Sequence, residues 1–262
     1  MVGTLSKRVL LLCLCVLFLG GAFLFRIELS NAFFRLGLSY PSFLFDPSAG
    51  RAYRIAMHHF DDATERSYNI ETAERFFRYT EQLDRDYPRV NHQLARIAFL
   101  KGQNDIALAR IDAELAICDN CAASHYIRGL ILGFMGRPQE AAEEFKTFLL
   151  WDPVNWAALN DLLWVLFAAG EYEEVKKEGA EAVALFPYNP WILNTYGMAL
   201  FYLGEEDTAL EILERSLFYT RFVTEEKWLT AYPGNDPKIA PRGVSALRDA
   251  IRENIHTVLS KE

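Results

Sequence analysis

Two cysteines three residues apart are the feature of this sequence whose type and spacing could carry chemistry. Cys118 and Cys121 form an isolated C-x-x-C pattern. A catalytic pair of this kind places its attacking thiolate at a helix N-terminus, where the helix dipole lowers the thiol pKa. Here the pair follows an expected helix and lies in an expected turn. That position favours a structural disulfide in an oxidising compartment, with free thiols and a thiol-redox module as alternatives.

No other set of residues has the spacing of a reactive site. His125 stands four residues after Cys121, but no fourth ligand follows at a spacing typical of zinc. The sequence contains no nucleophile elbow, phosphate-binding loop or H-E-x-x-H motif. We therefore expect a protein that is not an enzyme and that holds no metal or cofactor.

The charge of the chain also excludes one class of partner. The net charge is −8, and acidic and basic residues are mixed along the sequence. Such a balance repels phosphate backbones, and no basic stripe counteracts it. Nucleic acid is therefore not an expected partner.

Glycines recur at a constant interval through the middle of the chain. Gly102, Gly136, Gly170 and Gly204 are each separated by 34 residues. A glycine ends a helix readily because it adopts the left-handed conformation at little cost. A small residue five positions later lets two antiparallel helices approach closely; these residues are Ala107, Ala141, Val175 and Ala209. The register predicts stacked helix pairs, since one pair cannot bury its own apolar faces.

This pattern resembles the tetratricopeptide repeat family, and the segment GRPQEAAEEFKTFLLWDP (136–153) matches it closely. The resemblance covers four full units over residues 88–223. The customary tryptophan of the first helix is replaced in these units by Asn91, His125, Leu159 and Leu193. Gly179 stands where a large apolar residue is usual, so we expect loose packing in the third unit.

The resemblance implies an all-α, right-handed superhelical solenoid of antiparallel helix pairs. We expect a degenerate unit at 51–87, where Ala73 and Phe77 fit a second helix, and full units at 88–121, 122–155, 156–189 and 190–223. Residues 224–262 leave the period: 230–237 are expected to form a loop and 241–260 a capping helix. Such a helix closes the core of a terminal repeat against water.

The family resemblance also implies a ligand site. First helices line the concave face of such repeats, and the matching positions predict an aromatic groove with a basic end for a protein or peptide. The predicted groove residues are Arg89, His92, Arg96, Phe99, Tyr126, Asn160, Trp164, Phe167, Asn194, Phe201 and Tyr202. The glutamates of the second helices, such as Glu143 and Glu144, are expected to form a solvated face rather than a metal site.

The N-terminus carries an apolar run that could enter a membrane. Residues 9–25 contain no charge and follow Lys7 and Arg8. Their length is close to the lower limit for spanning a bilayer. Phe23, Leu24 and Phe25 continue the run past a small-residue site at Gly20 and Ala22, which favours an uncleaved single-pass anchor over a cleaved signal. The positive charges place the tail in the cytoplasm and the soluble domain outside it, in a periplasm.

Residues 1–25 are therefore expected to form the tail and transmembrane helix, and 26–50 an amphipathic segment and linker. The sequence predicts a membrane-anchored repeat scaffold, an adaptor or assembly factor for envelope proteins. The alternative is a cleaved, secreted periplasmic protein that binds a peptide or glycan. Fold class carries no function by itself, so this step rests on the family resemblance.

Overall fold

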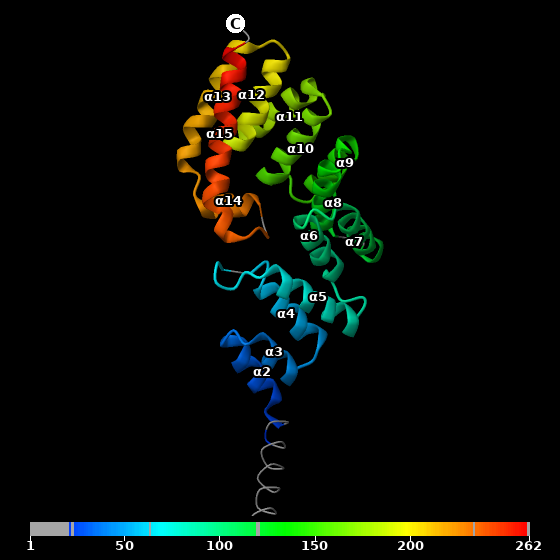
Figure 1. Ribbon diagram of the computed structural model, residues 1–262. Helices are drawn as coiled ribbons and strands as arrows, with labels where there is room; N and C mark the ends of the chain where they lie inside the picture. Colours follow the sequence, from blue (N-terminus) through cyan, green and yellow to red (C-terminus); the bar gives the residue numbers. More distant parts are fainter. Residues whose placement is uncertain (1–20, 22–23, 63, 119–120, 233, 261–262) are drawn as a thin grey trace, which may run out of the picture. The chain divides into compact units, whose positions relative to one another are not determined.

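The computed structural model describes residues 21, 24–62, 64–118, 121–232 and 234–260, and helices are the only regular secondary structure in these ranges. The chain divides into two compact units, Met1–Tyr87 and Pro88–Glu262 (Figure 1). Each unit has its own buried core. Phe76 and Phe77 are fully buried in the first unit, and Phe145 and Ile192 in the second.

Within the described residues of the first unit, the helices are α2 (Arg26–Arg35), α3 (Ser39–Phe45), α4 (Ala49–His58) and α5 (Ile70–Leu83). Ala73 and Phe77 of α5 are fully buried, and α5 packs on α4, which supplies the buried Ile55. Asn69 caps α5 by accepting a hydrogen bond from the Thr72 amide at 2.8 Å. The helix pair expected at 51–87 therefore forms, and it lies in the first unit with α2 and α3 rather than with the four full repeats.

The segment expected to be an amphipathic helix and linker is folded against α4 instead. Gly37 adopts φ +73° and ends α2, and α3 then runs through Pro41. Proline is tolerated there because first-turn amides have no partner inside the helix. Ser30 and Ser42 each donate a hydrogen bond to the backbone carbonyl of the other, at 2.7 and 2.9 Å. These bonds hold α2 and α3 together.

The second unit repeats one helix pair four times. The pairs are α6 (Val90–Leu100) with α7 (Asn104–Ile117), α8 (Ala122–Phe134) with α9 (Pro138–Leu149), α10 (Trp156–Ala168) with α11 (Tyr172–Leu185), and α12 (Pro190–Tyr202) with α13 (Glu206–Tyr219). The glycines expected to end the first helices all have φ between +70° and +82°. The amide after each glycine bonds back to the helix, as Gln103 does to the Ala98 carbonyl at 2.9 Å. The prediction for these turns is confirmed.

Close packing within each pair depends on the small residues five positions after the glycines. Ala107, Ala141, Val175 and Ala209 are all fully buried. The expectation of loose packing at Gly179 is wrong, because the ring of Tyr196 from the next first helix occupies the space. A Cβ at Gly179 would lie 2.6 Å from Cδ2 of that ring. The missing side chain is thus replaced by a tyrosine from a different helix.

The chain after α13 forms a short insert and then a long helix. The insert, residues 220–239, contains η1 (Thr220–Phe222), α14 (Glu225–Ala231) and η2 (Pro237–Ile239). Helix α15 (Ala240–Leu259) packs on α13 and α12, with Ile251 and Val258 buried. The expected capping helix is therefore present within one residue of its predicted bounds (Figure 1, red).

Among the helices of the described residues, none is both long and apolar enough to cross a bilayer. The predicted anchor, residues 9–25, lies outside the described part of the chain apart from Gly21, Leu24 and Phe25. The anchor therefore stays a prediction from the sequence.

Candidate functional site

The predicted groove positions largely serve as contacts between neighbouring first helices. At three of the four positions ten residues before a turn glycine, the side chain hydrogen-bonds to a neighbouring helix. His92 Nδ1 lies 3.0 Å from Ser124 Oγ of α8, and the Tyr126 hydroxyl donates to Asp161 Oδ2 of α10 at 2.6 Å. Asn194 accepts a hydrogen bond from Asn254 of α15 at 2.9 Å. The side chains at these positions therefore connect neighbouring helices and are not free to contact a ligand.

Three of the predicted groove residues are not open to a ligand. His92, Arg96 and Phe201 are only 3%, 7% and 5% exposed. Arg96 donates a hydrogen bond to Gln93 Oε1 at 2.9 Å, within its own helix. Phe201 lies in the core that includes Val258 of α15. The prediction that these three line an open groove is wrong, because neighbouring first helices and α15 lie close enough to cover them.

The predicted aromatic residues form two chains of ring contacts near the turn glycines. Phe99 contacts Phe134 at 5.2 Å between ring centroids, and Phe134 contacts Trp164 at 5.1 Å. Phe167 contacts Tyr202 at 5.5 Å, and Tyr202 stacks on Tyr172 at 4.7 Å. Such contacts stabilise the stack between repeats. Arg89, Phe134 and Tyr202 remain exposed, whereas Phe99, Asn160, Trp164 and Phe167 are half-buried.

Asp161 is a residue on this face that the sequence analysis did not select. Its carboxylate accepts hydrogen bonds from the Tyr126 hydroxyl at 2.6 Å and from Asn160 Nδ2 at 3.2 Å. Burial raises the pKa of Asp161 to about 6, against the lowering effect of those two hydrogen bonds. The sequence signal was absent, because an aspartate on a helix is normally read as a solvated residue.

Exposed apolar side chains gather instead at the turns between units. Large apolar residues recur 15 and 18 positions after the turn glycines, as with Trp151, Leu185, Tyr188 and Phe222. This surface, the turn edge, consists of Ile117, Leu150, Trp151, Val154, Leu185, Tyr188, Phe218 and Phe222, all of them exposed. Exposed large apolar side chains that recur along one edge are typical of interaction sites. Its 34-residue register is visible in the sequence and could have identified it.

A pocket of about 380 Å³ opens on the turn edge. Six of its thirteen lining residues are aromatic. Trp156 and Trp191 contact each other at 5.3 Å, and Tyr188 and Tyr219 at 5.0 Å. Phe222 and Lys227 of the insert complete the lining. A concave pocket that is mostly apolar, rich in aromatic rings and lined by a single charged side chain is typical of a recognition site rather than a catalytic one.

The insert shapes this pocket by folding back onto the first helices. Trp228 of α14 is only 8% exposed and forms an apolar cluster with Trp191 and Ala240. Further along, burial raises the pKa of the Tyr232 hydroxyl, and the nearby Asp161 carboxylate adds to that rise. The first-helix face of the third and fourth units is therefore partly covered by the chain itself.

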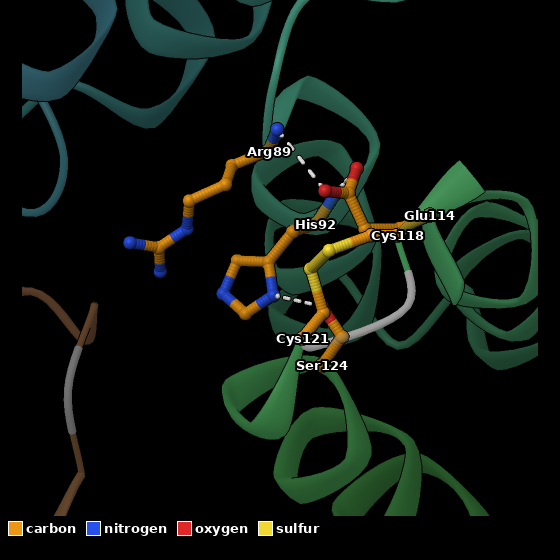
Figure 2. The surroundings of a disulfide bond; sticks show 6 residues. All are labelled: Arg89, His92, Glu114, Cys118, Cys121 and Ser124. Atoms are coloured by element: carbon orange, nitrogen blue, oxygen red, sulfur yellow. Dashed lines mark hydrogen bonds between the residues drawn. A yellow bond between two sulfur atoms is a disulfide. The ribbon is translucent and has the colours of Figure 1, made fainter. Parts of the chain in front are cut away.

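The C-x-x-C pair lies in the turn between the first and second full units (Figure 2). Cys118 and Cys121 form a disulfide with Cα atoms 5.7 Å apart. One helical turn before it, the buried Glu114 carboxylate accepts hydrogen bonds from the amides of Arg89 and His92, at 3.0 and 3.2 Å. Glu114 thereby caps α6, whose own preceding residue, Arg89, has φ +66° and offers no side-chain cap.

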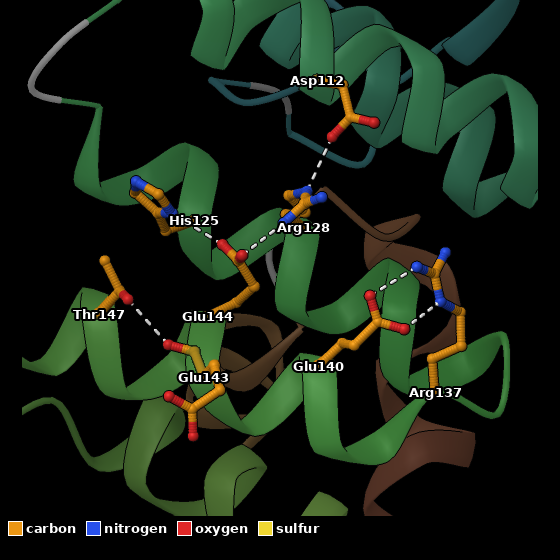
Figure 3. A network of polar contacts seen from close by, with 8 residues as sticks. All are labelled: Asp112, His125, Arg128, Arg137, Glu140, Glu143, Glu144 and Thr147. Atoms are coloured by element: carbon orange, nitrogen blue, oxygen red, sulfur yellow. Dashed lines mark hydrogen bonds and ion pairs between the residues drawn. The ribbon is translucent and has the colours of Figure 1, made fainter.

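The glutamates expected to be solvated divide into two kinds. Glu144 is largely buried and pairs with Arg128 at 2.5 Å and with His125 at 2.7 Å, while Arg128 also reaches Asp112 (Figure 3). Glu143 remains on the surface, as expected. The expectation is therefore wrong for Glu144, because Arg128 and His125 of α8 face it. Among the residues described, no group of three or more His, Cys, Asp or Glu side chains is placed to hold a metal ion.

The paired helices and their constant register define a class of fold, the helical repeat solenoids. Residues 122–155, the second full unit, match the tetratricopeptide repeat family. The neighbouring units keep the same 34-residue register and the same helix-pair fold as this matched unit.

Comparison with known proteins gives the same fold. An 81-residue stretch is 38% identical to cell division cycle protein 27 homolog B of Arabidopsis thaliana; it covers 31% of this chain and only 11% of that protein. MamA (41–end) from Desulfovibrio magneticus RS-1 superposes with a TM-score of 0.59 at 17% identity, over 66% of this chain and 95% of MamA. YrrB, described as a tetratricopeptide repeat protein with an unusual peptide-binding site, superposes with a TM-score of 0.57 at 15% identity. The match covers 69% of this chain and 91% of YrrB.

Proposed function

We propose that this chain is a membrane-anchored scaffold that binds a protein or peptide segment at the turn edge, with the aromatic pocket as the centre of the site. The pocket is the observation that carries the proposal. Its walls present Trp156, Trp191, Tyr188 and Phe222, and buried aromatic anchors dominate the energetics of protein recognition. YrrB supports a peptide ligand by analogy of fold.

The pocket can be tested without disturbing the core, since two of its residues are exposed. We expect the double variant Tyr188→Ala, Phe222→Ala to lose a crosslinked partner that the native chain captures from membranes. Loss of two anchors should weaken binding by about 2 kcal/mol or more. The matched control is Trp151→Ala, Val154→Ala, which removes edge residues that do not line the pocket. Equal capture by the pocket variant and the native chain would contradict the proposal.

The anchor is the second part of the proposal. The uncharged run 9–25 after Lys7 and Arg8 supports a single-pass helix with the repeat domain outside the cytoplasm. There the scaffold would assemble envelope proteins, and confinement to a membrane would raise the effective concentration of membrane partners.

Membrane anchoring has a direct measurement. We expect the full chain to stay in the membrane pellet after alkaline carbonate extraction, and a Leu14→Arg, Leu17→Arg variant to move to the supernatant. Charged residues at the centre of a span cost about 3 kcal/mol each, which a run this short cannot offset. A mature N-terminus near Phe23 would instead establish cleavage and favour the secreted alternative.

A further inference from the structure

The aromatic pocket has the size of a side-chain site. Its volume of about 380 Å³ falls at the lower end of ligand pockets, so it accommodates one large side chain with adjoining backbone. In its lining, Trp156 and Trp191 contact each other, and Tyr219 contacts both Tyr188 and Phe222. These rings favour the binding of an aromatic side chain, because ring–ring contacts add to the free energy gained from apolar burial.

Basic side chains surround the pocket, although the whole chain carries a net charge of −8. Lys227 is the only charged residue in the lining, and its ammonium donates a hydrogen bond to the Phe222 carbonyl at 3.2 Å. Arg215 donates to the Pro187 carbonyl at 3.4 Å, and Arg221 stacks 4.1 Å from the Phe218 ring centroid. Arg215 therefore contacts a residue that lines the pocket, Pro187, and Arg221 contacts Phe218, whose ring lies against the lining residue Tyr219.

The nearest acidic residues of the insert do not neutralise the positive charge beside the pocket. Glu225 and Glu226 precede Lys227, but they line a separate hollow with Pro241 and Val244. The pocket side of α14 therefore presents the ammonium, and the carboxylates belong to the other hollow. A ligand that enters the pocket meets positive charge at its edge.

We propose that the pocket binds an acidic peptide segment through one aromatic side chain. The ring enters between the tryptophans and tyrosines, and flanking carboxylates pair with Lys227, Arg221 and Arg215. This inference rests on the proposed function and specifies the chemistry of its partner. An anionic membrane surface would also be attracted by the cations, but a recessed pocket takes a protruding side chain rather than a planar surface.

The test uses the full chain and short fluorescein-labelled peptides. The probe has a central phenylalanine flanked by aspartates; one comparison peptide has lysines in place of the aspartates, and another has alanine in place of the phenylalanine. We expect the acidic phenylalanine peptide to bind at least about tenfold more tightly than either, since one charge-assisted contact contributes roughly that factor. Lys227→Glu should lower its affinity about tenfold and raise that of the lysine peptide. Lys146→Glu, an exposed charge reversal on α9, should change neither.

Two results would overturn the inference. One is equal affinity of the native chain for the aspartate and lysine peptides. The other is absence of peptide binding together with Lys227-dependent binding to phosphatidylserine-containing vesicles but not to phosphatidylcholine vesicles. The membrane capture experiment separates this inference from the proposed function. If Tyr188→Ala, Phe222→Ala still abolishes capture, the pocket remains a partner site and only the acidic ligand class fails.

Discussion

Replacing Gly243 with alanine is expected to destabilise the second unit by about 3 kcal/mol, because no side chain fits between α15 and α14. A Cβ at Gly243 would lie 2.0 Å from Cε2 of Trp228 and 2.3 Å from its Nε1. The indole is rigid and largely buried, so it must leave its cluster with Trp191 and Ala240. Urea unfolding would measure the loss, and tryptophan emission should shift to longer wavelength as Trp228 becomes exposed.

The sign of the effect depends on Trp228, which gives the experiment an internal control. In a Trp228→Ala background the obstruction is gone, and alanine should then stabilise α15 by about 1 kcal/mol through its higher helix propensity. Ser245→Ala, an exposed change in the same helix, should be nearly neutral. If Gly243→Ala is equally destabilising with and without Trp228, the contact between α14 and α15 is not the cause.

This contact also connects stability to the pocket. Phe222, Lys227 and Thr230 come from the insert, and the insert is fastened to the rest of the unit through Trp228. Release of Trp228 would therefore remove one wall of the pocket and its ammonium together. Peptide affinity should fall with Gly243→Ala even though that residue does not line the pocket.

The repeat register could be predicted from the sequence because it is determined locally. Glycine is the residue that adopts the left-handed turn at little conformational cost, and a small residue is needed where two helices cross closely. Both requirements recur every 34 residues. Gly102 and Ala107 show this: one has φ +70° and the other is fully buried. Family resemblance added the expected handedness of the solenoid, which periodicity alone does not give.

The candidate site was less predictable, because it depends on distances between helices. Matching positions identify a helix face but not how closely the next helix approaches it. Arg96 and Phe201 lie on the expected face, yet neighbouring elements cover both. The insert contributes Lys227 and Phe222 to the pocket from outside the repeats, and no periodic signal places it there.

The short helix α3 was missed for a related reason. Pro41 and Pro47 indicate a break, and the stretch around them lacks a clear periodicity. Tertiary hydrogen bonds decide the outcome instead: Arg51 is 2% exposed and bonds to Asp46 at 3.2 Å and to Asn31 at 2.5 Å. Partners 5 and 20 residues away cannot be recognised from local pattern.

Asp161 should make the stability of the chain decrease as the pH rises from about 4 to 6. Its pKa rises from the ordinary 3.8 to about 6 on folding, mainly through burial. In that range the folded state holds a proton that the unfolded chain has already lost, so each step up in pH favours unfolding. Each pKa unit corresponds to about 1.4 kcal/mol, and the rise therefore amounts to about 3 kcal/mol.

The comparison of the native chain with Asp161→Asn isolates this contribution, since all other carboxyls titrate alike in both. The side-chain oxygen of asparagine can still accept a hydrogen bond from the Tyr126 hydroxyl, but asparagine carries no charge at any pH. In urea unfolding, the free energy of unfolding of the variant should therefore rise relative to that of the native chain between pH 4 and 6. The difference should persist at pH 7. Asp249→Asn, which removes an exposed carboxylate of α15, should leave the pH profile unchanged. Parallel profiles for the native chain and Asp161→Asn would show that Asp161 is solvated like an ordinary surface carboxylate, and the first-helix face would then be open at its centre.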